Sequence, residues 1–184
     1  MADKGEIIYR VNDQDEIVYV NEQWDRFAVA NAGEAAASSQ VLHRPLWDFI
    51  SDLTTRELYR QVLKRIRDSS SVRFTFRCDS PNCRRMLEMD VRLWEDGTVQ
   101  FHTRTIWEER RQPPDFPETG AAGNGDELLR VCAWCKKVFV NGAWVEVEDA
   151  VVQLRLFHHE FQPLITHGIC ERCYEEMSKT LAEA

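Results

Sequence analysis

The chain has 184 residues and a mass of 21.5 kDa, with 43% hydrophobic and 29% charged residues and a formal net charge of −8. Its apolar runs are a few residues long, far short of the roughly 20 that a membrane-spanning helix needs, and its N-terminus lacks the pattern of a secretory signal. The excess of acidic side chains disfavours nucleic-acid binding. These features predict a cytoplasmic protein with no membrane partner and no nucleic-acid partner.

The first fifty residues predict a hairpin followed by short helices. Two β-rich runs, Ile7–Val11 and Ile17–Val20, are separated by a polar, turn-forming string. Asn21 is suited to cap a helix that carries its apolar residues on one face, and Gly33 is placed to end it. A short amphipathic turn is expected at residues 45–50.

A longer helix follows. Residues 54–57, Thr-Thr-Arg-Glu, have the spacing of a capping box. Apolar residues then recur at helical period through Leu58, Val62 and Ile66. The pattern predicts a helix over residues 56–67.

The next segment predicts three strands. From residue 72 apolar and polar residues alternate, first over 72–76 and again over 87–93, which is typical of strands with one solvated face. Asp96 and Gly97 both tolerate a positive φ and predict a hairpin into residues 98–106.

The order of these elements resembles that of PAS domains. The resemblance covers residues 5–107 and is carried by residues 17–21, Ile-Val-Tyr-Val-Asn, and by residues 42–50 ahead of the longer helix. It implies an α+β fold with a five-stranded antiparallel sheet and helices on one face, used for sensing or for homodimer formation. A ligand cavity between helices and sheet is a frequent feature of such folds.

Aromatic residues are the candidates for lining that cavity around a small apolar ligand, or else for filling the core. Neither haem nor flavin is expected. Haem-binding PAS domains take an axial histidine from the long helix, whereas His43 and His102 lie elsewhere, and no cysteine for flavin photochemistry lies between residues 31 and 58. The candidate lining residues are Trp24, Trp47, Phe49, Phe74 and Phe76.

Two cysteines lie close together in the N-terminal part. Cys78 and Cys83 belong to the string Cys-Asp-Ser-Pro-Asn-Cys, at an expected turn between strands. They are interpreted as a redox pair, as two ligands of an incomplete metal site, or as two free thiols.

A change in composition suggests the domain boundaries. Residues 108–128 are rich in proline, glycine and charge and predict a flexible linker. Residues 1–107 then form the PAS-like sensor or dimerisation domain, and residues 129–184 form a small domain of a size that metals often stabilise.

Four cysteines dominate that small domain. Cys132 and Cys135, and then Cys170 and Cys173, form two Cys-x-x-Cys pairs, which is the ligand spacing of a tetrahedral thiolate site. Four thiolates close the coordination shell without water, so the expected ion is structural, with zinc favoured over iron. His167 is an alternative to one thiolate, with a supporting role expected instead.

The surrounding residues predict a knuckle, a hairpin and a helix. Asn141 and Gly142 predict a hairpin turn, residues 147–157 predict a helix or a strand packed over it, and the residues after Cys173 repeat at helical period. This order is similar to that of treble-clef zinc fingers.

The small domain also resembles segments at the C-terminal ends of bacterial PAS proteins, sensor kinases and response regulators. The shared features are Cys-x-x-Cys-Lys at residues 132–136, Trp144, and Thr-His-Gly-Ile-Cys-x-x-Cys at residues 166–173. The resemblance implies a signalling role. Because the chain has no kinase or receiver region, its output would pass to a protein partner.

The sequence leads to three hypotheses about function. The favoured hypothesis is a cytoplasmic signalling or regulatory protein, not an enzyme, in which a PAS module is coupled to a structural zinc module. The alternative is a redox sensor whose cysteine pairs release the metal when oxidised. A thiol-disulfide oxidoreductase is disfavoured, because the hairpin expected after Cys135 does not suit that chemistry.

Overall fold

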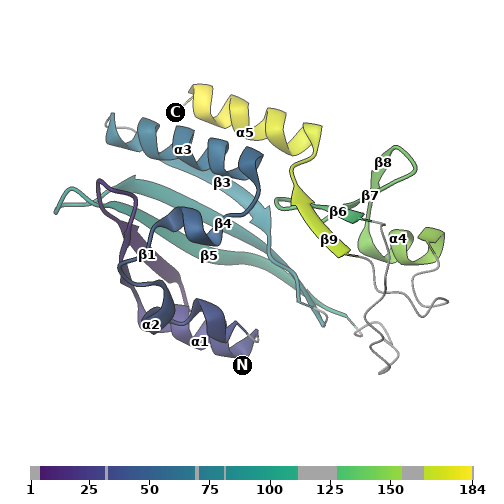
Figure 1. Cartoon of the computed structure of the whole chain (residues 1–184), viewed down its shortest axis with the longest axis horizontal. Helices are drawn as coiled ribbons and strands as arrows, with labels where there is room; N and C mark the ends of the chain where they lie inside the picture. The colour runs from purple at the N-terminus through teal and green to yellow at the C-terminus, as the bar shows by residue number, and fades with distance from the viewer. Residues whose placement is uncertain are drawn as a thin grey trace.

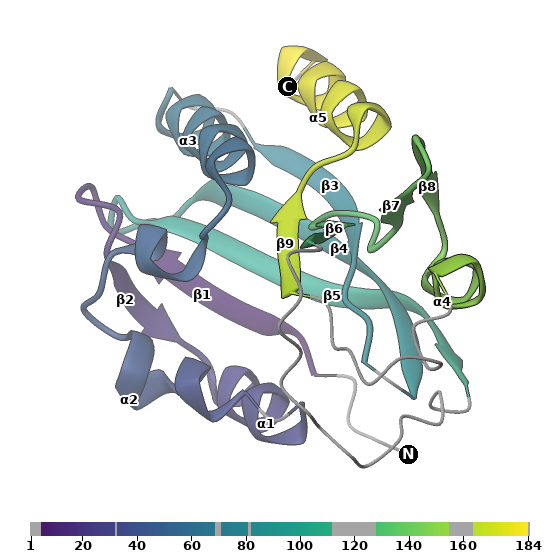
Figure 2. The same ribbon diagram turned by 45° about the vertical axis from the view of Figure 1, so that its right-hand side comes forward.

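The first of two sheets is antiparallel and has five strands, in the order β2-β1-β5-β4-β3 (Figures 1 and 2). The computed structural model describes residues 5–31, 33–68, 71–80, 82–111, 128–154 and 164–183. The strands of this sheet are β1 (Ile7–Val11), β2 (Ile17–Val20), β3 (Val72–Arg77), β4 (Cys83–Leu93) and β5 (Val99–Arg110).

Helices cover one face of this sheet. Tyr9 on β1 and Phe101 on β5 stack with ring centroids 4.5 Å apart. Tyr9 also meets Trp24 of α1, and Phe101 meets Tyr59 of α3, so both helices pack on the same face. The expected α+β fold with a five-stranded antiparallel sheet is confirmed. The helical segments are α1 (Glu22–Ala30), η1 (Glu34–Ala36), α2 (Ser38–Val41), η2 (Leu46–Phe49) and α3 (Leu53–Arg67).

The helix starts follow from side-chain caps. The Asn21 side chain accepts a hydrogen bond from the Trp24 N–H, as predicted for the start of α1. The capping box predicted at residues 54–57 is wrong. Asp52 is the N-cap of α3 and accepts from the Thr55 N–H at 2.6 Å, so the helix begins three residues earlier than predicted.

The strand predictions are confirmed, with two extensions, one of which starts β4 at Cys83, four residues earlier than predicted. Gly97 has a φ of 83° in the turn between β4 and β5. The last strand continues to Arg110. Its pairing with β4 shifts register between Met86 and Leu87, which leaves Ile106 as the extra residue of a β-bulge.

The second sheet has four strands, in the order β8-β7-β6-β9. The β7–β8 hairpin was predicted, and the segment predicted as either a helix or a strand begins with helix α4. The parallel pairing of β6 with β9 was not predicted. The elements of this part are β6 (Leu128–Cys132), β7 (Val138–Val140), β8 (Ala143–Val145), α4 (Val147–Leu154), β9 (Leu164–Gly168) and α5 (Glu171–Glu183).

One hydrophobic core joins the two parts of the chain. Helix α5 packs beside α3 and β3 (Figure 2), and its Met177 and Leu181 belong to the same buried cluster as Leu58 and Val62 of α3. The predicted division into residues 1–107, 108–128 and 129–184 stays a prediction, and most of the expected linker lies outside the described residues. The shared core means that neither part buries all its apolar surface alone.

We predict that Met177→Ala lowers the free energy of unfolding of the whole chain by about 2–4 kcal/mol, because it leaves a cavity where a thioether is now buried. Circular dichroism and tryptophan fluorescence should report one coincident transition in urea. Glu176→Ala, on the exposed side of the same helix, is the matched control and should change stability by less than about 0.5 kcal/mol. Two transitions, of which only one responds to Met177→Ala, would contradict a shared core.

Candidate functional site

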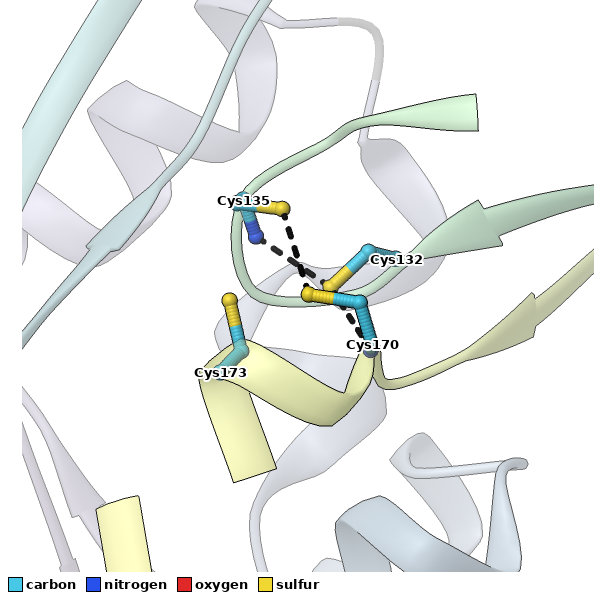
Figure 3. Close-up of side chains that lie close together, drawn as sticks. All are labelled: Cys132, Cys135, Cys170 and Cys173. Carbon is cyan, nitrogen blue, oxygen red and sulfur yellow. Dashed lines mark hydrogen bonds between the residues drawn. The ribbon is translucent and has the colours of Figure 1, made fainter. Parts of the chain in front are cut away.

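The thiols of four cysteines converge beside the first sheet. The Sγ atoms of Cys132, Cys135, Cys170 and Cys173 all lie within 4.8 Å of one another (Figure 3). Cys132, Cys170 and Cys173 are buried, and Cys135 is partly exposed. The structure therefore brings together all four residues that the sequence predicted as metal ligands.

The parallel pairing of β6 with β9 explains how distant pairs meet. Cys132 is the last residue of β6 and lies in register with Gly168 on β9. Because the strands run in the same direction, both end at the same edge of the sheet. Cys170 follows Gly168 by two residues, so each pair begins where one of these strands ends.

The first pair lies in a tight knuckle. The Lys136 N–H donates to the Cys132 carbonyl at 3.0 Å, and Lys136 has a φ of 61°. The Cys132 Sγ accepts from the N–H groups of Cys135 at 3.5 Å and Cys170 at 3.4 Å (Figure 3). Backbone N–H groups aimed at sulfur favour a thiolate at this position.

The second pair begins a helix. Cys170 precedes Glu171, the first residue of α5, and Cys173 lies in its first turn. The positive end of the helix dipole favours negative charge there. The Cys170 Sγ lies 3.9 Å from the Cys135 Sγ, so the two pairs are in direct contact.

Three of the thiols share hydrogen bonds that shift their pKa values in opposite directions. Hydrogen bonds from the Cys135 and Cys173 thiols hold the pKa of Cys132 far below its usual range. The same hydrogen bonds to Cys132 raise the pKa of Cys135 and of Cys173. A metal ion would replace these shared protons, so its binding would release protons.

Cations offset the charge that such a cluster would carry. Arg172 has a raised pKa, chiefly through Glu176 and further through the thiols of Cys173 and Cys135. Arg172 and Lys137 line a cavity of about 370 Å³ that also reaches the two thiols. Cys135 and Cys173 therefore face this cavity.

Trp134 inserts the knuckle into the core of the first sheet. It lies between the two cysteines of the first pair, and its side chain is only 8% exposed. Its ring packs against Phe74 and Phe76 of β3, with centroids 5.2 and 6.4 Å away, and against Tyr59 of α3 at 6.2 Å. The Arg77 N–H donates to the Trp134 carbonyl at 2.7 Å.

The β7–β8 hairpin is tied to the second pair. The Trp144 indole N–H donates to Glu171 at 3.0 Å, which joins the hairpin to the start of α5. The Arg130 guanidinium lies over the rings of Phe139 and Trp144 at 4.1 and 5.1 Å. These contacts fix the position of α5 relative to the knuckle.

The donor set suits a metal such as zinc. Four cysteine sulfurs in a compact, mostly buried cluster match the ligands of structural tetrahedral sites. Four thiolates would complete a tetrahedral shell around such an ion without water or substrate. Cys132, Cys135, Cys170 and Cys173 would hold the ion, whose role would be to fix β6, β9 and α5.

The remaining cysteines and His167 lie outside the cluster. His167 is exposed on β9. Cys83 is buried at the start of β4, and the Cys78 N–H donates to the Arg85 carbonyl at 3.0 Å. Burial raises the pKa of the Cys78 thiol. Among the described residues, neither Cys78 nor Cys83 belongs to a group that could hold a metal.

The five predicted cavity residues lie in separate surroundings. Phe74 and Phe76 pack on Trp134, and Phe76 also borders the cavity beside Cys135. The other three engage polar groups: Trp24 donates to the Ala36 carbonyl, Trp47 donates to Asp15, and Phe49, 38% exposed, lies under Arg44. The contacts of these five residues do not outline one shared cavity.

The sequence analysis assigned no role to two residues of this site. Trp134 could have been noticed in the sequence, because a metal knuckle does not require a large aromatic residue between its two cysteines. Arg77 is buried and forms ion pairs with Asp79 and, at 2.6 Å, with Glu146. Its position in the strand did not indicate this role, because Glu146, the partner that joins it to the second sheet, lies 69 residues away in the sequence.

The chain matches no protein-family model, and a search of curated proteins finds no significant match. Within the described ranges, none of the helices combines the length and the hydrophobicity that crossing a bilayer requires.

We predict that the purified chain binds one zinc ion and that Cys170→Ser loses it, because a serine hydroxyl is a far weaker zinc ligand than a thiolate. Elemental analysis by mass spectrometry measures zinc per chain. Cys78→Ser removes a thiol outside the cluster and should keep the full zinc content. Zinc retained by Cys170→Ser, or absent from the folded wild-type chain, would refute the assignment.

Proposed function

We propose that this chain is a cytoplasmic signalling or regulatory protein in which a PAS-like sensing or dimerisation module is coupled to a structural zinc module. The observation that carries the proposal is the position of Trp134. Its backbone belongs to the metal knuckle, and its side chain belongs to the core of the five-stranded sheet. A change in either module must therefore be accommodated by the other.

Two features support the PAS-like part of the proposal. The sheet has five antiparallel strands, and helices cover one of its faces, as the resemblance implies. The outer face carries cross-strand ion pairs, such as Arg73 with Asp90 at 2.8 Å and Arg104 with Glu88 at 2.6 Å. Such a polar face is compatible with solvent or with a polar partner.

The treble-clef-like part rests on the order of knuckle, hairpin and helix. The first pair of cysteines precedes the β7–β8 hairpin, and the second pair begins α5. Asn141 and Gly142, with φ angles of 49° and 83°, form the hairpin turn that the sequence predicted. The parallel strands β6 and β9 are an addition to that order.

The output is proposed to pass to a protein partner. A net charge of −8 favours a partner with basic patches, because complementary charge accelerates encounter and selects among partners. Homodimer formation through the PAS-like module is part of the same proposal.

Loss of the metal should loosen the first sheet at β3. We predict that zinc removal by a chelator increases hydrogen exchange of the amides in Val72–Arg77 by about tenfold or more, because Trp134 then loses its fixed position against that strand. Ile17–Val20 at the opposite edge of the sheet serves as the internal control and should change little. Hydrogen exchange read by mass spectrometry measures both segments. An effect confined to residues 128–183 would argue against coupling.

A redox sensor is the second candidate, and the exposure of one thiol favours it. Cys135 is partly exposed and faces the same cavity as Cys173, whereas Cys132 and Cys170 do not border it. A peroxide entering the cavity would meet these two thiolates first. One peroxide oxidises the two thiolates to a disulfide and leaves as two hydroxide ions, and the metal loses half of its ligands.

The redox candidate predicts a Cys135–Cys173 disulfide and release of zinc when the loaded chain is treated with a small excess of hydrogen peroxide. A chromogenic chelator follows the zinc, and peptide mass spectrometry identifies the disulfide. Cys78→Ser should release zinc at the wild-type rate, since Cys78 lies outside the cluster. Zinc that stays bound through this treatment would eliminate the redox candidate and leave the structural role intact.

A thiol-disulfide oxidoreductase is the third hypothesis. The second pair does follow a strand, β9, and its second cysteine lies in the first turn of a helix, α5, as that chemistry requires. Its thiols, however, point at the other pair rather than at an open substrate site. The convergence of four thiols favours metal binding over turnover.

A further inference from the structure

A second cavity lies between helix α1 and the sheet, away from the cysteine cluster. Its volume is about 320 Å³, within the range of sites for small organic ligands. Ile7, Phe27 and Leu87 supply apolar walls, and Thr103 and Thr105 supply hydroxyl groups. None of the five aromatic residues predicted to line a cavity borders this one.

The alternation of β4 places Arg85 on the same face as Leu87, and the β-bulge in β5 brings Glu108 to that face as well. Leu87 pairs with Thr105, Met86 pairs with Trp107, and Ile106 is the extra residue. Beyond the bulge, Arg85 lies opposite Glu108, and both residues line the cavity. A charged side chain is thus placed on the side of the sheet that α1 covers.

The contacts of Arg85 hold its guanidinium in place without neutralising its charge. Its Nη1 donates to the Asn31 side-chain oxygen at 3.3 Å, and its guanidinium lies 5.8 Å from the centre of the Phe27 ring. Asn31 is itself held by donating to the Phe27 carbonyl at 2.8 Å. Among the described residues, Arg85 forms no ion pair with a carboxylate, which leaves most of its five N–H donors for a ligand.

The other arginines of the cavity are already paired. Arg26 contacts Glu22 at 2.5 Å, and Arg104 contacts Glu88 at 2.6 Å. Among the described arginines of this cavity, Arg85 is therefore the one that has no carboxylate as an ion-pair partner and can accept a bound anion. A carboxylate matches it best, because guanidinium and carboxylate form two parallel charge-assisted hydrogen bonds.

We propose that this cavity binds a small organic monocarboxylic acid, with its carboxylate on Arg85 and its apolar body against Ile7, Phe27 and Leu87. The inference names a ligand class for the PAS-like sensing module and in that respect rests on the proposed function, but it does not involve the cysteine cluster. A bound acid would reinforce the contact between β4 and the end of α1, where Arg85 already donates to Asn31, the residue after the helix.

Titration of the full chain with 4-methylpentanoate and phenylacetate, followed by calorimetry and by amide NMR shifts, tests the proposal. We expect at least one acid to bind, to shift the amides of α1 and of residues 85–87, and to bind about tenfold or more tightly than its neutral amide. Arg85→Gln should weaken acid binding by a similar factor, because glutamine keeps a donor for Asn31 but no charge.

Arg92→Gln is the matched control, since Arg92 is an exposed arginine on the same strand and lies outside this cavity. It should bind the acid as the wild type does. Circular dichroism of each variant checks that the sheet is intact.

Equal affinity for acid and amide, unchanged affinity in Arg85→Gln, or no binding of either acid by the folded chain would overturn the inference. Zinc content, measured on the same samples, keeps this result separate from the proposed function. If the chain contains zinc but binds no acid, only the cavity proposal is refuted. If the chain binds the acid but contains no zinc, only the metal centre is refuted.

Discussion

The burial of Trp134 between two metal-ligand candidates is the constraint on which the arrangement of both sheets depends. The indole is packed against β3 and α3, so the knuckle that carries it cannot move away from the first sheet without exposing a large apolar surface. Cys132 and Cys135 flank this anchor. Once they are fixed, the four thiols can converge only if β9 and α5 are held at the same place, which the β6–β9 pairing and the packing of α5 on α3 achieve.

Electrostatic contacts reinforce the same junction from the outside. Arg77, at the end of β3, pairs with Glu146 just after β8, while Arg84 on β4 and Arg111 after β5 both pair with Glu148 on α4. Arg77 is buried, and removing a partner from a buried charge is far more costly than breaking an exposed ion pair. The hydrophobic anchor and the buried ion pair therefore act on opposite sides of the same strand end, and together they orient the second sheet.

The sequence predicted those parts of the molecule whose signals are local. A few neighbouring residues are enough to predict each of these parts: the hairpin turns at Gly97 and Gly142, the cap at Asn21 and the two Cys-x-x-Cys pairs. The parallel pairing of β6 with β9 was missed, because it joins short strands far apart in the chain. The cap of α3 was wrong for a different reason: Asp52 and Thr54 are both good caps, and only the path of the chain out of the preceding turn selects Asp52.

Neighbouring residues of β4 link the two proposed sites. Arg84 and Arg85 point to opposite faces of the strand, as adjacent residues in a strand must. Arg84 reaches Glu148 in the metal-bearing part, and Arg85 reaches the cavity under α1. The bulge beside them is the one point at which the β4–β5 ladder shifts register. A carboxylate bound to Arg85 would therefore contact the same strand segment that, through Arg84 on its other face, forms the ion pair with Glu148 beside the cysteine cluster.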